Sequence, residues 1–173
     1  MSLDDVLNLS RAVEDRLFAC KDFLVCQNIM FVLSFGNEVR TDEMITRSLK
    51  DHKHVYVPRL VTRERRLEVC EINDMDQEFE LGSYDIREPS RSNSKVVSPS
   101  KIDAIIAPGL AFDRSGARIG FGKGYFDWLF KHLPDEALRL GVAYEFQVVD
   151  SVPQDSWDEM VQIILTENDT INC

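Results

Sequence analysis

The sequence contains no long run of apolar residues. A helix that crosses a membrane needs about 20 predominantly apolar residues, and no stretch of the 173 residues approaches that length. No basic and apolar leader of the kind that directs secretion precedes the first expected helix. We therefore expect a cytoplasmic protein that does not act at a membrane.

Basic residues are also scarce, with 20 Lys and Arg against 30 Asp and Glu and a formal net charge of -10. This excess of negative charge opposes binding to nucleic acids and anionic membranes, so neither is an expected partner. An anionic small molecule would need a local basic site. Arg114, Arg118 and Lys123 are the candidates because they lie close together in the sequence.

Cysteine and histidine are few and irregularly spaced. The cysteines stand in apolar or terminal contexts, and we interpret them as reduced packing residues and not as a zinc site. No local motif of Ser/His/Asp or Cys/His catalysis is present, although residues far apart in the sequence could still meet. The residues concerned are Cys20, Cys26, Cys70, Cys173, His52, His54 and His132.

Apolar patterns with alternating helical and strand periods predict one α/β domain over residues 1–173. Helices are expected at residues 3–26, after the N-cap candidate Thr41, and at 125–132. Strands are expected at 30–34, 55–57, 67–72, 102–107, 140–143 and 161–165. Residues 67–72 have the pattern of an edge strand, and 73–100 have the composition of a loop. We expect a three-layer sandwich with a mostly parallel central sheet flanked by helices.

Glycine is rare, and five of the eight glycines fall between Gly109 and Gly124. An expected strand precedes this run and an expected helix follows it. Glycine lets the backbone take positive φ and approach a ligand closely, so the alternating Gly120, Gly122 and Gly124 predict a nest of N–H groups for an anion. Strand, glycine loop and helix together form a phosphate-binding layout.

A flexible loop is the alternative interpretation, because glycine clusters also mark turns. A linker would be rich in Ser and Gly, whereas this run carries cations, an aromatic pair and Asp127. It matches neither common nucleotide motif. No Ser or Thr follows Lys123, as a P-loop requires, and the glycine spacing differs from G-x-G-x-x-G. We therefore favour phosphate or nucleotide binding by a less common type of loop.

Ligands of open α/β sheets bind beyond the carboxyl ends of the strands. Four segments are expected to meet there: Ser34-Phe-Gly-Asn-Glu38, Pro58-Arg59, the glycine loop and Trp157-Asp158. Asp127 and Asp158 could jointly hold one Mg²⁺, with nucleotide phosphates completing its oxygen shell. Taken singly, each has a simpler interpretation: a helix N-terminal carboxylate for Asp127 and a turn residue for Asp158.

The glycine run resembles the central motif of the 5-formyltetrahydrofolate cyclo-ligase (methenyltetrahydrofolate synthetase) family. The matching residues are Pro108-Gly-Leu-Ala-Phe-Asp113 and Gly116-x-Arg118-x-Gly120-x-Gly122-Lys123-Gly124-Tyr125-Phe126-Asp127. Four further segments are similar to the family and occur in the family's order along the chain, at residues 34–41, 57–59, 85–89 and 158–167. The resemblance covers about residues 10–167, and it implies a fold similar to the ribose-phosphate isomerase/CoA-transferase-like fold.

The resemblance implies an enzyme that closes 5-formyltetrahydrofolate to 5,10-methenyltetrahydrofolate with ATP and Mg²⁺. Positioning and charge neutralisation would carry most of such a reaction. Catalytic roles are implied for Arg118, Lys123 and Tyr125, and magnesium binding for Asp127 and Asp158. ATP contacts are implied at Arg118, Gly120, Phe121, Gly122, Lys123, Gly124 and Tyr125. Folate contacts are implied at Phe35, Glu38, Pro58, Tyr84 and Tyr125.

Two departures from the family's pattern support a second hypothesis. Phe121 stands where the family usually has Arg, and nothing before Arg11 corresponds to the family's basic first helix, as if the chain began about one helix late. The alternative is a divergent relative that binds folate or nucleotide with little or no turnover. A third option is a phosphate-sugar or CoA-ester protein that shares only the fold. A monomer or weak homodimer is expected.

Overall fold

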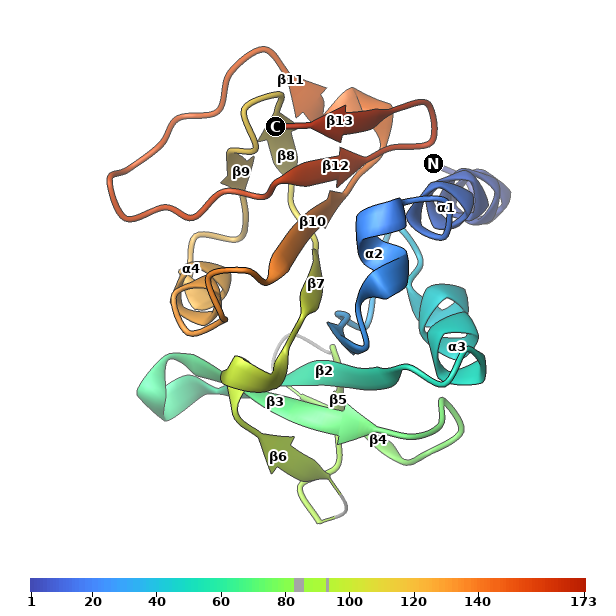
Figure 1. Cartoon of the computed structure of the whole chain (residues 1–173), viewed down its shortest axis with the longest axis vertical. Helices are drawn as coiled ribbons and strands as arrows, with labels where there is room; N and C mark the ends of the chain where they lie inside the picture. The colour runs from blue at the N-terminus through green and yellow to red at the C-terminus, as the bar shows by residue number, and fades with distance from the viewer. Residues whose placement is uncertain (83–85, 93) are drawn as a thin grey trace.

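The computed structural model describes residues 1–82, 86–92 and 94–173. Over this part of the chain, eight strands form one sheet in the order β13-β12-β10-β7-β1-β2-β3-β6 (Figure 1). Their bounds are β1 Asn28–Met30, β2 His54–Val61, β3 Arg66–Ile72, β6 Lys95–Val97, β7 Ala104–Ala107, β10 Leu138–Val142, β12 Ile163–Leu165 and β13 Thr170–Asn172.

The middle of this sheet is parallel and its edges are antiparallel. Strands β12, β10, β7, β1 and β2 pair in parallel, whereas β13 at one edge and β3 and β6 at the other pair antiparallel. The protein therefore has an α/β fold with a large mixed sheet. Two smaller sheets accompany it among the described residues. They are β4 Phe79–Leu81 with β5 Arg87–Pro89, and β8 Ala111–Asp113 with β9 Arg118–Ile119 and β11 Val148–Val149.

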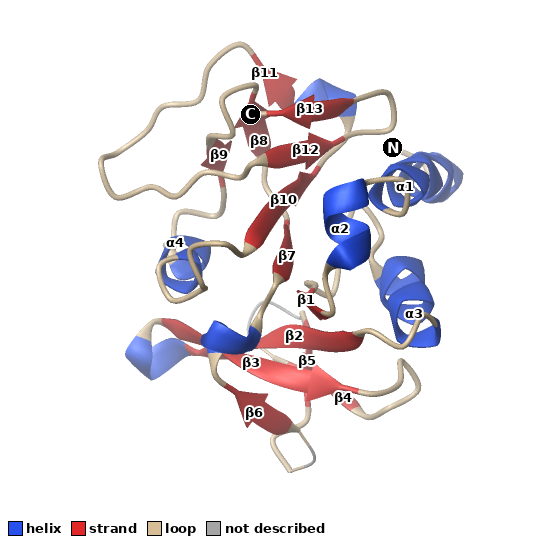
Figure 2. Ribbon diagram, in the orientation of Figure 1, coloured by secondary structure: helices blue, strands red, loops and turns tan. Residues whose placement is uncertain are grey.

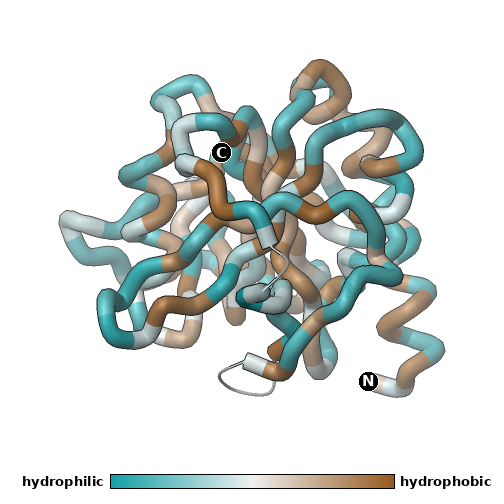
Figure 3. The backbone as a smooth tube through the Cα atoms, turned by 90° about the horizontal axis from the view of Figure 1, so that it is seen from below, coloured by the Kyte–Doolittle hydropathy of each residue, from teal (hydrophilic) through white to brown (hydrophobic). Residues whose placement is uncertain are grey.

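Helices lie on both faces of the large sheet (Figure 2). Helices α1 Leu3–Leu17, α2 Lys21–Val25 and α3 Asp42–Lys50 lie on one side, and α4 Tyr125–Phe130 lies on the other. Along β7, Ala104 and Ile106 belong to the apolar cluster that includes the first three helices, while Ile105 and Ala107 belong to the cluster that includes α4. A strand buried on both faces is apolar throughout. In Figure 3 hydrophilic residues are concentrated in the outer turns.

The helix expected at residues 3–26 is two helices. The α1 helix ends at Leu17 and α2 begins at Lys21. Where the chain turns, the rings of Phe18 and Phe23 pack edge to face with their centroids 5.4 Å apart. Both helices bury apolar residues in the same cluster. The prediction was wrong at the turn because apolar periodicity reports the buried face and continues across such a break.

Residues 73–100 are not a single loop, contrary to the prediction, because β4, β5 and β6 lie within them. Each of these strands has 3 residues, too few for alternation to stand out. Since β6 pairs with β3, residues 67–72 are not an edge strand. Strand β2 continues through Pro58 because Tyr56 is its last residue that pairs with β1, so no donor toward β1 is needed at the proline.

Strands β2, β7, β10 and β12 confirm the expected strands at 55–57, 102–107, 140–143 and 161–165, with shifted bounds. Helix α4 confirms the first part of the helix expected at 125–132. All four cysteines are free thiols, as interpreted from the sequence. Within the described ranges, no helix combines the length and apolar character that crossing a membrane requires.

Candidate active site

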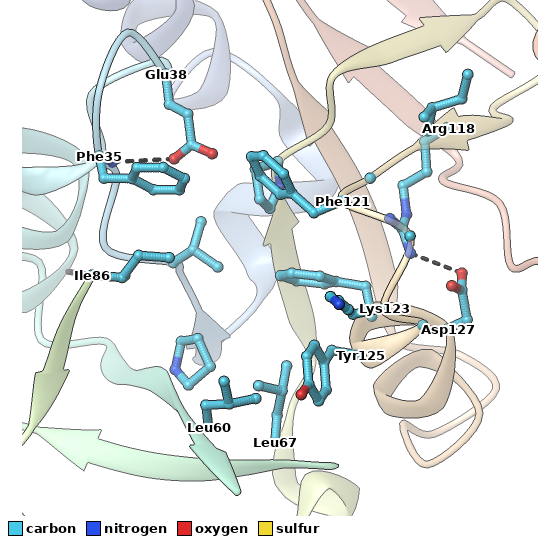
Figure 4. A pocket seen from close by; sticks show the side chains of 18 of the residues that line it. Phe35, Glu38, Leu60, Leu67, Ile86, Arg118, Phe121, Lys123, Tyr125 and Asp127 are labelled. Atoms are coloured by element: carbon cyan, nitrogen blue, oxygen red, sulfur yellow. Dashed lines mark hydrogen bonds and ion pairs between the residues drawn. The ribbon is translucent and has the colours of Figure 1, made fainter. Parts of the chain in front are cut away.

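A pocket of about 660 Å³ lies beyond the ends of β1 and β7, which lead into it through Leu33 and Pro108 (Figure 4). This is the carboxyl end of the parallel strands, where such sheets bind ligands. The lining residues are Val32, Leu33, Phe35, Glu38, Pro58, Leu60, Leu67, Ile86, Arg87, Glu88, Pro108, Arg118, Ile119, Gly120, Phe121, Gly122, Lys123, Gly124, Tyr125, Phe126, Asp127, Pro153 and Asp158.

The loop between β9 and α4 forms one wall of the pocket. Gly122 and Gly124 have φ of +70° and +69°, and a Cβ added at either would meet no atom within 4 Å. Side chains rarely adopt this backbone conformation, so glycine is needed here, and the loop backbone is open to a ligand. Gly120 does not take a positive φ. Two glycines, and not the predicted three, therefore have the left-handed conformation of a nest.

Lys123 lies between these two glycines and lines the pocket (Figure 4). Its ammonium group forms no ion pair with another described residue. An exposed lysine without a partner on an open glycine loop can bind a phosphate as a point charge. Of the three cations predicted for a basic site, Lys123 is therefore the one that lines the pocket without an ion pair to another described residue.

Arg118 is engaged with neighbours inside the protein. Its side chain is 5% exposed, and Nη2 donates to Oδ1 of Asp127 at 2.9 Å. The guanidinium also lies over the rings of Phe126 and Phe130, at 5.3 and 5.0 Å from their centroids. Burial lowers the pKa of Arg118, and the charges of Asp127 and Asp158 oppose that shift. Arg118 therefore holds Asp127 in place, while its buried Nε has no hydrogen-bond partner among the described residues.

Asp127 and Asp158 line the same pocket, and the negative charge of each favours the charged form of Arg118 and so acts to raise its pKa. Asp127 belongs to the first turn of α4. Asp158 lies in the segment before β12, where its Oδ2 accepts a hydrogen bond from the backbone N–H of Asp155 at 2.8 Å. In the part of the chain that the structure describes, no group of three or more His, Cys, Asp and Glu side chains could hold a metal ion. A cation held by these two carboxylates would need further oxygens from a ligand or water.

The opposite wall is mainly apolar and carries a partly buried carboxyl group. Phe35 and Ile86 belong to it (Figure 4), and Pro58 also lines the pocket. Glu38 accepts a hydrogen bond from the backbone N–H of Phe35 at 3.2 Å. Burial raises the pKa of Glu38 to about 7, with smaller opposing effects from that hydrogen bond and from the charge of Arg40. This wall can therefore present a protonated carboxyl group near neutral pH.

Hydrogen bonds at both ends hold the loop that carries Glu38. Thr41 occupies the N-cap position of α3, as predicted, but its side chain does not cap the helix. Its hydroxyl instead donates to the carbonyl of Val32 at 2.6 Å and accepts from the N–H of Ser34 at 3.2 Å. The hydroxyl of Tyr144 donates to the carbonyl of Glu38 at 3.2 Å. These contacts position the carboxyl group at the pocket.

Comparison with known proteins relates the chain to one family, and not only to a fold. A sequence profile described as the 5-formyltetrahydrofolate cyclo-ligase family matches residues 1–167. The chain belongs to this family.

Relatives from distant organisms match most of the chain. The 5-formyltetrahydrofolate cyclo-ligase of Mus musculus is 26% identical over 176 residues, which cover 97% of this chain and 87% of the mouse protein. That of Escherichia coli K12 is 25% identical over 152 residues, covering 87% and 84%. The NMR structure of Aquifex aeolicus 5,10-methenyltetrahydrofolate synthetase superimposes with a TM-score of 0.85 at 30% identity, covering 99% of this chain and 84% of that one.

The pocket gathers almost all of the site residues that the sequence analysis assigns to a cyclo-ligase. Those that line it are Phe35, Glu38, Pro58, Arg118, Gly120, Phe121, Gly122, Lys123, Gly124, Tyr125, Asp127 and Asp158. Their individual roles stay predictions. Tyr84, the remaining residue of the set, lies outside the described residues.

Some residues near the predicted motifs are not part of the pocket lining. Arg114 forms an ion pair with Asp169 at 3.7 Å and is not a lining residue, so it is not part of the basic site proposed from the sequence. Arg59 is buried in an ion pair with Glu68. Because successive side chains of a strand point to opposite faces, Pro58 can line the pocket while Arg59 cannot.

Sequence reasoning missed the segment that includes β5. Ile86, Arg87 and Glu88 line the pocket, although the prediction assigned them to a loop. Glu88 accepts a hydrogen bond from the N–H of Leu60 at 3.3 Å, and burial raises the pKa of its carboxyl group. The family-like segment at residues 85–89 was the available signal, because the composition of this region is that of a loop.

Proposed function

We propose that this chain catalyses the ATP-dependent closure of 5-formyltetrahydrofolate to 5,10-methenyltetrahydrofolate, with release of ADP and phosphate. One observation carries the proposal. One wall of the pocket is an open glycine loop whose Lys123 has no ion-pair partner among the described residues, and the facing wall is apolar with a partly buried carboxyl group. The first wall suits a polyphosphate, and the second suits a flat organic ring system.

The chemistry needs both ligands in one place. The formyl oxygen is a poor leaving group until it carries a phosphoryl group. In the proposed reaction the formyl oxygen forms a bond to the γ-phosphorus and the bond to ADP breaks. N10 then attacks the formyl carbon, the carbon–oxygen bond breaks, and phosphate leaves as N10 loses its proton. Holding the formyl oxygen in line with the γ-phosphate is the main task of the protein.

We assign the glycine loop to ATP. The loop backbone and Lys123 would bind the phosphates, since the loop is open and the ammonium has no ion-pair partner in the part of the chain that the structure describes. Arg118 contributes mainly by holding Asp127, because its side chain is nearly buried. Tyr125 follows the loop and lines the pocket, where it would contact both substrates.

We assign the opposite wall to the folate. Phe35 and Pro58 supply apolar surface for the ring system, and Glu38 would donate or accept a hydrogen bond there. The fold assignment belongs to the same proposal. Helices on both faces of a sheet with a parallel centre support a single three-layer domain of the ribose-phosphate isomerase/CoA-transferase-like type.

Mg²⁺ is the metal we assign to Asp127 and Asp158. Both supply the hard oxygen donors that Mg²⁺ prefers, and two protein carboxylates leave positions for substrate phosphates and water. When bound, Mg²⁺ neutralises charge on the phosphates. In the protein, Arg118 keeps one oxygen of Asp127 fixed by its hydrogen bond at 2.9 Å.

A spectrophotometric assay tests the function. The protein is mixed with 5-formyltetrahydrofolate, ATP and Mg²⁺, and the near-ultraviolet absorbance of the methenyl product is followed while phosphate is measured. We expect product and phosphate to form in equal amounts, and neither to form when ATP is replaced by a non-hydrolysable analogue. Absence of ATP-dependent product at high protein concentration would contradict the proposal and favour a divergent binding protein.

A further inference from the structure

Two aromatic rings from different loops meet at the pocket. Phe35 lies in the loop between β1 and α3, and Phe121 lies in the glycine loop before α4. Their ring centroids are 5.9 Å apart, and the ring planes are tilted by 34°. Figure 4 shows the two side chains facing each other across the space between the loops. The pair therefore connects the two walls.

Phe121 lies at the rim of the pocket. It is one of the lining residues, yet 64% of its surface is exposed. A ring so exposed adds little to the core in this state, and a planar ligand that packed against it would remove apolar surface from water. Phe121 is thus placed to cover a ligand that is already inside.

The backbone around Phe121 has room to adjust. Gly120 and Gly122 flank it, and Gly122 has the left-handed φ of +70° with no atom within 4 Å of an added Cβ. The ring can move with the loop when a ligand enters between it and Phe35. By contrast, Phe35 is tied to the folate wall, because its N–H donates to Glu38 at 3.2 Å.

We propose that Phe121, although it belongs to the phosphate-binding loop, is a specificity residue for the folate: with Phe35 it forms an aromatic cover over the folate ring beside Glu38. The inference rests on the proposed function. It reassigns Phe121 from the ATP contacts expected from the sequence. Within one loop, the open backbone and Lys123 serve the phosphates, while the intervening Phe121 serves the other substrate.

The direction of the Phe121 ring favours the folate over the adenine of ATP. Its aromatic partner is Phe35, which is bonded to the carboxyl group of the apolar wall. On the other wall, Arg118 donates a hydrogen bond to Asp127, so these charged groups are engaged with each other and not with the two aromatic rings. A flat ring under the cover would therefore contact the apolar side of the pocket.

The test compares Phe121→Ala, Phe121→Leu and Phe121→Tyr by steady-state kinetics with each substrate varied in turn. For Phe121→Ala we expect the KM for 5-formyltetrahydrofolate to rise roughly ten-fold, with the KM for ATP changing less than about two-fold. Phe121→Leu keeps apolar volume without a ring, so its KM for 5-formyltetrahydrofolate should also rise, whereas Phe121→Tyr keeps the ring and should have a KM close to that of the wild type. An equal rise in both KM values, a rise for ATP alone, or no change would overturn the assignment.

A double variant tests whether the two rings act together. Phe35→Ala with Phe121→Ala should raise the folate KM little beyond the larger of the two single effects, because either change removes the same cover. Effects that multiply independently would contradict a joint cover. Unchanged melting temperatures for the Phe121 variants are expected, since that ring is largely exposed.

Calorimetry separates this inference from the proposed function. If the wild-type protein shows no turnover, the proposed function fails. Binding of 5-formyltetrahydrofolate to the wild-type and Phe121→Ala proteins is then compared directly. A roughly ten-fold weaker affinity in the variant still supports the cover, and equal affinities, or no binding to either protein, overturn it.

Discussion

The two walls of the pocket differ in how far their ionisable side chains are exposed to solvent. On the glycine-loop wall, Lys123 is exposed and without an ion-pair partner among the described residues. On the facing wall, Glu38 is mostly buried, and its pKa is raised to about 7. An exposed ammonium keeps its charge for an anionic ligand, whereas a buried carboxyl group favours its neutral form. The contrast shows how one pocket can offer a polyphosphate and an organic ring system separate places.

The largest effect that we predict tests the burial of Glu38. Its pKa of about 7 in the folded protein lies above the ordinary glutamate value of 4.5, so Glu38 binds more protons in the folded protein than in the unfolded chain between these values. The contribution of Glu38 to stability should therefore fall as pH rises through this window and level off above it. Glu38→Gln removes the titration, so its stability relative to the wild type should improve from pH 4 to pH 8, by on the order of 3 kcal/mol.

Urea unfolding of both proteins at several pH values measures this difference. Glu43→Gln is the matched control, because Glu43 is exposed on α3 and outside the pocket. This variant reports the effect of removing an acidic side chain from the same part of the fold without changing the pocket. If the difference in unfolding free energy between the Glu38 variant and the wild type is the same at every pH, the pKa of Glu38 is not raised. The contrast between the two walls would then lose its support on the folate side.

The next effect concerns the charge of the other wall. Lys123→Ala should raise the KM for ATP roughly thirty-fold, as expected for the loss of a charged contact to phosphate. The KM for 5-formyltetrahydrofolate should change less than about two-fold. Lys131→Ala is the control, since Lys131 is exposed just after α4 and does not line the pocket. If Lys123→Ala raises the KM for both substrates equally, the two walls do not bind separate substrates as proposed.

The smallest effect concerns the shape of the loop. Gly122→Ala places a side chain at a φ of +70° in open space, so it should cost about 1 kcal/mol of stability through strain alone. The methyl group also enters the phosphate wall, and the ATP KM should rise a few-fold. Thermal unfolding and kinetics measure the two effects.

Gly36 provides a close control for that variant. It has a φ of +56° with nothing within 4 Å of an added Cβ, and it lies in the loop of the folate wall beside Phe35. Gly36→Ala should lose similar stability without raising the KM for ATP. If both variants raise the KM for ATP equally, the effect of Gly122→Ala reflects general strain and not the place of Gly122 in the phosphate wall.

The parts of the fold and site that could be predicted from the sequence are those with local causes. The apolar run of β7 identifies a strand buried on both faces, and the clustered glycines identify a loop whose backbone is open. The short strands β4, β5 and β6 carry too few residues for a pattern, and they form because neighbours pair with them.

Long-range contacts account for what the sequence could not predict at the site. Arg118 was identified as a cation for phosphate, but its packing on Phe126 and Phe130 and its ion pair with Asp127 require the folded α4. The meeting of Phe35 with Phe121 joins loops that are distant in the chain. Local patterns identify which residues are available, whereas tertiary packing determines what each one contacts.

A structure with 5-formyltetrahydrofolate and a non-hydrolysable ATP analogue bound together tests the division of the pocket most directly. We expect the triphosphate within hydrogen-bond distance of the Lys123 ammonium and the loop amides. We expect the folate ring against Phe35 and Phe121, beside Glu38. A triphosphate on the apolar wall, or a folate carboxylate on Lys123 with ATP elsewhere, would contradict this division.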